Sequence, residues 1–306
     1  MDQLRRDFDV IFDPGLWSDP DRLAREIVSA LALIVRNQTQ VKAPLIKLAE
    51  NLKIVARAGV GLDNIDVPAA SEAGIVVAYT PDENSVAVVE LTIGLILALA
   101  RKIVAANRDT RSGNWHRKAM TGTEIRGKTL GVVGFGRIGS LTAVAARGLG
   151  MQILAYDPYV DPGAEHVIRA GAKIVELKAL LERSDMVSCH LPATDQTRGL
   201  FNAERFRQMK PASFFVNVAR GEIVDEAALI DALQSGHLAG AALDVRQSEP
   251  PSHGPLNEMD QVILTPHVGG FTKEAQDRVV AAVCRDVLAV LDGKPARNAV
   301  NFSSPR

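Results

Sequence analysis

A glycine-rich turn between an apolar segment and a helical pattern constrains the fold of this chain more than any other feature. The segment Thr129–Val133 is followed directly by Gly134–Gly139, which reads GFGRIG. In such a turn the first glycine permits the tight bend, the second lets a ligand approach the backbone, and the third lets the next helix pack on the strand. The N-terminus of that helix presents free N–H groups to an anion. The segment therefore predicts a strand, a phosphate-binding turn and a helix.

An acidic residue lies at the spacing that a dinucleotide site requires. Asp157 comes 18 residues after Gly139 and follows a second apolar segment, Gln152–Ala155. A carboxylate at this place accepts hydrogen bonds from a ribose diol and repels a 2′-phosphate. The order of strand, glycine turn, helix, strand and acid predicts an NAD site. Its expected contacts from this region are Gly134, Gly136, Arg137, Ile138, Gly139 and Asp157.

Composition excludes several other classes of protein. The chain has 306 residues, of which 47% are hydrophobic, enough for two domains with separate cores. The net charge is −1 and the charges are mixed, so no basic surface for nucleic acid is predicted. The apolar stretch Val86–Ala100 is interrupted by Glu90 and is too short for a membrane span. Cys189 and Cys284 lie in apolar segments, which favours reduced thiols in the cytoplasm, and no spacing of His, Cys or acids predicts a metal site.

From residue 129 onward, short β-like segments alternate with helical patterns. This alternation predicts a Rossmann-type doubly wound parallel sheet with helices on both faces. The six predicted strands are Thr129–Val133, Gln152–Ala155, Met186–His190, Phe214–Asn217, Gly240–Asp244 and Val262–Leu264. Ligands of such sheets bind at the carboxyl ends of the strands. Residues that follow these ends include Asp157, Pro192, Arg220, Asp244 and His267.

The first 80 residues predict a smaller α/β unit. Its expected strands are Val10–Phe12, Leu33–Val35, Lys53–Ala56 and Ile75–Ala78, with a helix at Asp21–Ala30. Pro81 ends this unit. A second long helical pattern, Lys273–Leu291, follows the last predicted strand and is expected to return to the small unit. We therefore expect one discontinuous domain, residues 1–82 and 272–306, and one continuous domain, residues 83–271, joined by two hinges.

Four further segments complete the pattern. They are Arg57–Asp66 (RAGVGLDNID), Asn217–Gly221 (NVARG), Asp244-Val245 followed by Glu249-Pro250, and Thr265–Gly270 (TPHVGG). Together with the glycine turn, these motifs resemble the D-isomer-specific 2-hydroxyacid dehydrogenase family over nearly the whole chain. The resemblance is nearest to the catalytic core of phosphoglycerate dehydrogenases. It implies an NAD-binding Rossmann domain, a flavodoxin-like domain that binds the substrate, and an NAD-dependent oxidoreductase acting on a small D-2-hydroxy acid.

The residue types suit that chemistry. Hydride transfer at a carbinol carbon needs a group that exchanges the hydroxyl proton, and histidine exchanges protons near neutral pH. His267 takes this role, Glu249 orients its ring, and the planar fork of Arg220 binds the carboxylate and carbonyl of the substrate. The resemblance assigns the same three catalytic roles and adds Asp244 as the partner of the nicotinamide carboxamide. It also implies cofactor contacts from Pro192, Ala219, His267 and Gly269.

The substrate itself is left open by the sequence. The glycine-rich loop containing Val60 and Gly61 can form an anion nest, which in the family holds the substrate carboxylate. Arg57 and Arg117 are candidates for binding a second anion such as a phosphate. A glyoxylate or hydroxypyruvate reductase uses the same scaffold, and formate oxidation is a weaker reading because formate has no carbon chain to select. A non-enzymatic, NAD-sensing protein that resembles transcriptional corepressors is the alternative of another class.

Three further expectations come from the resemblance. The apolar helix Val86–Ala100 and the arm Arg101–Arg126 imply a homodimer. The chain ends at Arg306, soon after the returning helix, so we expect no regulatory domain. Family members open with a strand, whereas Leu4–Asp7 resembles the end of the first helix. Either the small sheet lacks a strand or the true start lies upstream.

Overall fold

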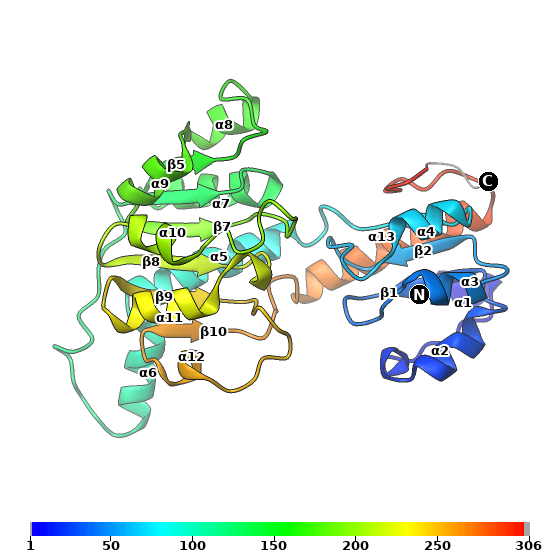
Figure 1. The fold of residues 1–306 in the computed structure, drawn as a ribbon, viewed down its shortest axis with the longest axis horizontal. Coiled ribbons are helices and arrows are strands. Elements are labelled where there is room, and N and C mark those ends of the chain that lie inside the picture. Colours follow the sequence, from blue (N-terminus) through cyan, green and yellow to red (C-terminus); the bar gives the residue numbers. More distant parts are fainter. Residues whose placement is uncertain (1, 303–306) are drawn as a thin grey trace. The chain divides into compact units, whose positions relative to one another are not determined.

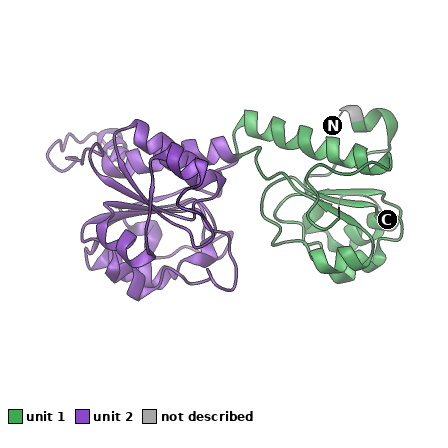
Figure 2. Ribbon diagram, turned by 90° about the horizontal axis from the view of Figure 1, so that it is seen from above, with its two compact units in different colours: residues 1–84, 271–306 green, residues 85–270 purple. Residues whose placement is uncertain are grey.

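Two compact units make up the chain (Figures 1 and 2). Unit 1 consists of residues 1–84 and 271–306, and unit 2 of residues 85–270. The computed structural model describes residues 2–302. The last four residues of the predicted small domain, 303–306, therefore lie outside the described part.

Unit 2 is built on a seven-stranded parallel sheet. The strands are β4 (Thr129–Val133), β5 (Gln152–Tyr156), β6 (Lys173–Ile174), β7 (Met186–Cys189), β8 (Ser213–Asn217), β9 (Leu238–Leu243) and β10 (Val262–Leu264). Their order is β10-β9-β8-β7-β4-β5-β6, and every neighbouring pair is parallel. The chain winds outward from β4 in both directions, so the loops after β4 and β7 diverge at a topological switch point. The predicted doubly wound sheet is confirmed.

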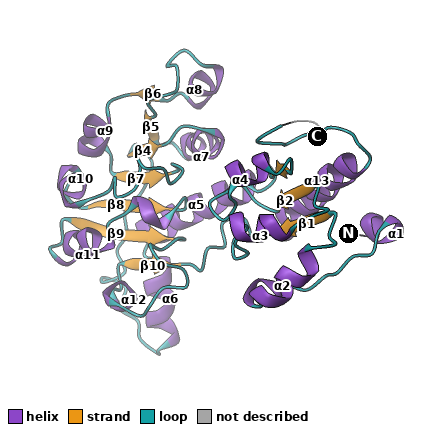
Figure 3. Ribbon diagram, turned by 45° about the vertical axis from the view of Figure 1, so that its right-hand side comes forward, coloured by secondary structure: helices purple, strands orange, loops and turns teal. Residues whose placement is uncertain are grey.

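Helices cover both faces of this sheet (Figure 3). The helical elements of unit 2 are α5 (Ser85–Ala100), α6 (Ile103–Arg111), α7 (Arg137–Gly148), α8 (Glu165–Ala170), α9 (Leu177–Arg183), α10 (Ala203–Gln208), η2 (Gly221–Ile223), α11 (Glu226–Gln234) and α12 (Pro255–Glu258). Successive residues of a strand face opposite sides of a sheet. Accordingly, Val132 packs in the core under α5, α7 and α8, while Val133 packs in the core under α9, α10 and α11.

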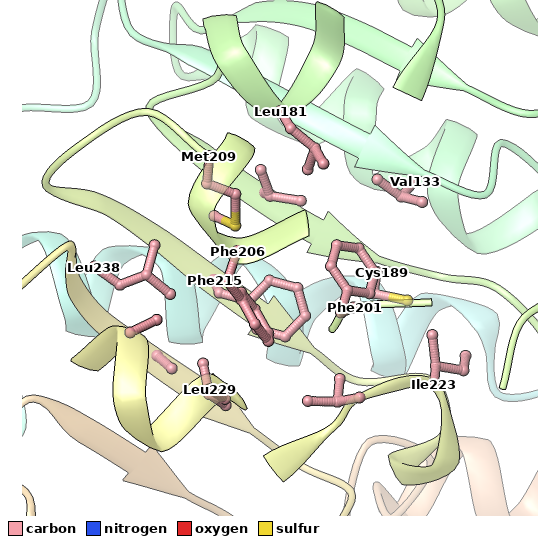
Figure 4. Close-up of a cluster of buried hydrophobic side chains, with 14 of the residues drawn as sticks. Val133, Leu181, Cys189, Phe201, Phe206, Met209, Phe215, Ile223, Leu229 and Leu238 are labelled. Atoms are coloured by element: carbon pink, nitrogen blue, oxygen red, sulfur yellow. The ribbon is translucent and has the colours of Figure 1, made fainter. Parts of the chain in front are cut away.

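Three phenylalanines fill the centre of the second core (Figure 4). The ring centroid of Phe215 lies 4.7 Å from that of Phe201 and 5.3 Å from that of Phe206, in tilted and edge-on arrangements. Such pairs add to the stabilisation that apolar burial provides. Phe201 also forms a single parallel bridge with Val224. The core thereby fixes the chain just after η2, which begins beside Arg220.

Unit 1 contains a three-stranded parallel sheet in the order β1-β2-β3. The strands are β1 (Ala32–Val35), β2 (Ile54–Arg57) and β3 (Val76–Ala78), and the helices are α1 (Asp2–Asp7), η1 (Leu16–Ser18), α2 (Pro20–Ile27), α3 (Ala43–Leu48), α4 (Val67–Glu72) and α13 (Lys273–Leu291). Helix α13 packs on β2 and β3 together with α1. The C-terminal segment continues this sheet, because Val300 N donates to Val77 O at 2.9 Å.

One predicted strand is wrong. Residues Val10–Phe12 form no strand, although β1, β2 and β3 occur where the other three strands were expected. An extended segment becomes a strand only when a neighbour supplies its ladder of hydrogen bonds, and no strand of the described chain pairs with this one. Of its three side chains only Val10 packs against the core of unit 1, whereas Ile11 is 55% and Phe12 64% exposed.

Helix α5 shows how an apolar stretch is used here. It begins one residue before the predicted segment, and its buried residues, among them Val88, Leu95, Ile96 and Leu99, lie mostly on one face, whereas Val86 is 54% exposed. Within residues 2–302, no helix combines the length and the apolar character that a bilayer crossing needs. Packing against α7 and the β-sheet therefore accounts for the apolar residues of its inner face.

Candidate active site

The glycine turn lies between β4 and α7 and fits a pyrophosphate. Gly134 has φ +89°, and a Cβ there would lie 2.8 Å from the carbonyl carbon of His190. A Cβ on Gly139 would lie 2.1 Å from Gly134 O, so only glycine allows α7 to approach this closely. A Cβ on Gly136 would meet nothing within 4 Å. The open space at the N-terminus of α7 is where an anion meets the free N–H groups of a helix.

Asp157 follows β5 and holds this turn in place. Its Oδ2 accepts a hydrogen bond from Phe135 N at 2.9 Å, and its Oδ1 accepts one from Tyr159 N at 3.0 Å. A carboxylate has about four lone-pair sites, so capacity for a ribose diol remains. The predicted diol acceptor is therefore also a structural tie between the turn and the end of β5.

His267 and Glu249 form a close pair. The distance from His267 Nδ1 to Glu249 Oε2 is 2.7 Å, with 37% and 33% of the two side chains exposed. His267 comes three residues after β10 and has φ +54°, a left-handed conformation that is uncommon for a residue with a side chain. Because Glu249 engages Nδ1, the other ring nitrogen, Nε2, is the one left to meet a substrate.

Glu249 is held as a carboxylate. Burial acts to raise its pKa, but the hydrogen bond and charge of His267, the backbone N–H of Arg246 and the charge of Arg220 together lower the pKa below its ordinary 4.5. A carboxyl group with a lowered folded-state pKa stabilises the fold above its unfolded-state pKa, and that contribution is lost as the pH falls through the folded-state value. Glu249 is therefore ionised at neutral pH, where its carboxylate accepts the contact with His267.

Asp244 holds the turn that carries His267. Its buried carboxylate accepts hydrogen bonds from Thr265 Oγ1 at 2.6 Å, Val268 N at 2.9 Å and Gly269 N at 2.8 Å. Its main-chain oxygen accepts from His267 N at 2.8 Å. The side chain that the resemblance assigns to the nicotinamide thus already takes three hydrogen bonds from its own chain. Thr265, which its sequence motif did not single out, is one of the three donors to this carboxylate.

Arg220 lies just beyond β8, where Asn217 shapes the turn. Asn217 Oδ1 accepts from Ala219 N at 3.1 Å, and Asn217 Nδ2 donates to Arg220 O at 2.9 Å. The guanidinium donates from Nη1 to Ala219 O at 2.7 Å. Asn217 belongs to the NVARG motif, but the motif alone did not reveal its function as the clamp that sets the backbone of Arg220.

Arg57 ends β2 of unit 1 and is 8% exposed. Its Nη1 donates to Ala58 O at 2.8 Å, and Gly59 makes room for it, since a Cβ at Gly59 would lie 2.4 Å from Nη1. Val60 and Gly61 follow in the same half-buried loop. Arg117 lies in unit 2, exposed on the arm after α6.

His190 and Pro192 follow β7, next to the glycine turn. His190 N donates to Val133 O at 2.8 Å, and its Nε2 lies 2.9 Å from Ser188 Oγ. Burial lowers the pKa of His190 to about 4, so the ring is neutral at physiological pH. Pro192 O accepts a hydrogen bond from Thr197 Oγ1 at 2.6 Å, which closes the following loop. No cluster that could hold a metal ion occurs in the part of the chain that the structure describes.

The neutral His190 predicts a pH dependence of stability. Its pKa is 6.5 when unfolded and about 4 when folded, so the unfolded chain binds the proton more readily and stability is lost as the pH falls from 6.5 to 4. At 1.36 kcal/mol for each pKa unit, the loss is at most about 3 kcal/mol. In urea unfolding followed across this range, His190→Gln should flatten the pH slope.

A matched control is His253→Gln, because the His253 side chain is 74% exposed. It should leave the slope as in the unmodified chain. An unchanged slope in His190→Gln would contradict the assignment of a neutral ring to His190.

Comparison with known proteins gives a consistent picture. Residues 93–269, more than half of the chain, match the family model described as "D-isomer specific 2-hydroxyacid dehydrogenase, NAD binding domain". A D-3-phosphoglycerate dehydrogenase of Archaeoglobus fulgidus is 46% identical over 285 residues, which are 93% of this chain and 54% of that protein. The chain therefore spans about half the length of the curated relatives that it matches.

Two solved structures share the fold over nearly the full length. The holo form of D-mandelate dehydrogenase from Rhodotorula graminis has a TM-score of 0.90 and 31% identity, and the match covers 100% of this chain and 94% of that one. D-lactate dehydrogenase from Aquifex aeolicus, solved with NAD and lactic acid, has a TM-score of 0.83 and 29% identity, covering 91% and 89%.

Proposed function

Because the chain belongs to the D-isomer specific 2-hydroxyacid dehydrogenase family, we propose that it interconverts a small D-2-hydroxy acid and its 2-keto acid with NAD as cofactor. The observation that carries this proposal is the 2.7 Å contact between His267 Nδ1 and Glu249 Oε2, with the charge of Arg220 acting on the same carboxylate. These are the three side chains that proton exchange and carboxylate binding require.

The chemistry follows from the roles of these groups. When bound, the reduced cofactor would supply the hydride for C2 of the keto acid. His267 donates a proton from Nε2 to the carbonyl oxygen, while Glu249 keeps the ring oriented. Arg220 binds the substrate carboxylate and polarises the carbonyl through its planar fork. In oxidation, neutral His267 accepts the hydroxyl proton.

The cofactor would be held by two groups of residues. The first is the glycine turn, with Gly134, Gly136, Arg137, Ile138 and Gly139 at the pyrophosphate and Asp157 at the ribose. The second, assigned by family resemblance, is at the nicotinamide end. It consists of Pro192, Ala219, Asp244, His267 and Gly269. The fit of the glycine turn and the acceptor capacity of Asp157 support this placement.

The substrate that we favour carries a second anion, such as 3-phosphoglycerate. Relatives at 43–46% identity are named D-3-phosphoglycerate dehydrogenase. On this proposal the Val60–Gly61 loop binds the substrate carboxylate, and Arg57 and Arg117 bind the distal phosphate or sulfonate. A glyoxylate or hydroxypyruvate reductase is the alternative within the same reaction type.

A panel of keto acids tests the function. With NADH we expect turnover of 3-phosphohydroxypyruvate at higher kcat/KM than hydroxypyruvate or glyoxylate. His267→Ala should lose about 10²–10⁴-fold in kcat in both directions, since it removes the general acid and base. Glu249→Gln should lose about 10–100-fold, because the ring keeps its proton chemistry but loses its orienting charge.

NADH binding, measured by fluorescence, serves as the control and should persist in both variants. Near-normal turnover by His267→Ala would remove it from proton transfer. Reduction of none of the keto acids by the unmodified protein would overturn the proposed function as a whole.

Cofactor preference provides a second test. We expect a preference for NAD over NADP, because the Asp157 carboxylate repels a 2′-phosphate. Asp157→Ala should narrow the ratio of the two kcat/KM values by about tenfold or more, the effect of one charged hydrogen bond. Asp161→Ala is the matched control, since Asp161 Oδ1 accepts from Gly163 N in a local turn. Comparable efficiency of the unmodified protein with both cofactors would contradict the role of Asp157.

We also propose a homodimer in the cytoplasm. No residue of α6 is buried, and large apolar side chains on and after it are exposed: Ile103 at 53%, Val104 at 41% and Trp115 at 75%. An isologous contact between two copies would bury them. The two buried cysteines, Cys189 and Cys284, suit a reducing compartment. Light scattering at micromolar concentration should give twice the mass of one chain, and a monomer would refute the dimer.

A further inference from the structure

We propose that Glu226 and Arg246 form a positioning pair that fixes the Glu249 carboxylate against His267. The inference deepens the proposed function, because it concerns the same proton-exchanging pair. Neither residue stood out in the sequence, and neither is expected to touch the substrate or cofactor. They act through the loop that connects β9 to Glu249.

The pair itself has a fixed geometry. Arg246 donates from Nε to Glu226 Oε1 and from Nη2 to Glu226 Oε2, both at 2.9 Å. Glu226 Oε1 also accepts from Gln247 N at 2.8 Å. The side chains are only 10% and 20% exposed. A two-point contact between a guanidinium and a carboxylate fixes orientation as well as distance, and partial burial shields it from water.

Glu226 is itself held at the start of a helix. It is the first residue of α11, and Asp225 caps that helix by accepting from Ala227 N and Ala228 N. Burial acts to raise the pKa of Glu226, but the hydrogen bond and charge of Arg246 and the N–H of Gln247 lower the pKa overall. The helix N-terminus favours the same ionised form. The anchor is therefore charged at neutral pH and is attached to regular structure.

The backbone of Arg246 connects the Glu226–Arg246 pair to Glu249 and, through Glu249, to His267. Arg246 N donates to Glu249 Oε1 at 3.1 Å, while Glu249 Oε2 meets His267 Nδ1. The carbonyl oxygen of Arg246 packs on Gly221, where a Cβ would come within 1.9 Å of it. Arg246 thus contacts the backbone next to Arg220 through its carbonyl oxygen and the carboxylate of Glu249 through its N–H.

The loop that carries Glu249 contains no helix or strand of its own. Residues 244–254 form turns and coil between β9 and α12, and residues 247–253 are exposed. If this loop were unrestrained, the Glu249 side chain would sample many conformations. Ordering it against His267 would then cost conformational entropy. The charged groups of unit 2 that act on Glu249 are His267 and Arg220, with Arg246, Glu226 and Asp244 in the network behind them.

Two variants break the pair in different ways. Glu226→Ala removes the anchor, and Arg246→Lys keeps the positive charge but loses the two-point geometry. In both, we expect kcat to fall by about 10–100-fold, as is usual when an orienting partner is lost, with little change in NADH affinity. Because Glu249 loses the Arg246 N–H, its carboxyl pKa should rise toward the ordinary value.

Nuclear magnetic resonance measures the contact between His267 and Glu249 without any substrate bound. The Nδ1 proton of His267, shifted downfield by its short hydrogen bond to a carboxylate, should weaken or exchange faster in both variants. The carboxyl carbon of Glu249, assigned by its disappearance in Glu249→Gln, should titrate at higher pH. Asp225→Ala is the matched control, since it removes the cap of the same helix and leaves the Glu226–Arg246 contacts in place.

The outcomes separate the two proposals. Unmoved His267 and Glu249 signals in Glu226→Ala and Arg246→Lys would overturn the positioning role, as would shifts of equal size in Asp225→Ala. If the unmodified protein reduces no keto acid but the two signals move as expected, the positioning pair stands and the proposed function falls. Arg246→Lys keeps the test decisive should Glu226→Ala fail to fold.

Discussion

A single buried carboxylate organises this site. Asp244 directly follows β9 and is 1% exposed, and its two oxygens accept three hydrogen bonds from the turn after β10. A buried charge of this kind is costly unless its acceptors are satisfied. The turn must therefore close around Asp244, and this closure places His267 at φ +54°. The position of the ring follows from the need to satisfy the acid at the end of the neighbouring strand.

The same logic extends outward through the loops at this edge of the sheet. Asn217 fixes the turn before Arg220, and Arg246 packs on Gly221 while its N–H reaches Glu249. Each proposed catalytic residue is thus held by hydrogen bonds from the strand ends and loops at this edge. Parallel strands bring these loops together, because their carboxyl ends meet at one edge. The phenylalanine core beneath keeps that edge rigid through the bridge between Phe201 and Val224.

Local pattern predicted much of the fold. The glycine turn, β4 and β10 lie at their predicted residues, and α13 begins and ends where its periodicity indicated. Val10–Phe12 has the composition of a strand but no neighbour to pair with, and β6 was missed because two residues carry no periodic signal. Strand formation depends on a partner, which a local pattern does not contain.

The sequence by itself determined the class of chemistry: a glycine turn with an acid 18 residues later, and an arginine, a glutamate and a histidine that follow strands. Only the tertiary structure decided how these groups are held. The 2.7 Å pair of His267 and Glu249, the three hydrogen bonds that Asp244 accepts and the two-point contact of Glu226 with Arg246 join residues 18 to 25 positions apart. Hydrogen bonds depend on distance and angle in space, and the folded strands, not the spacing along the chain, set those quantities.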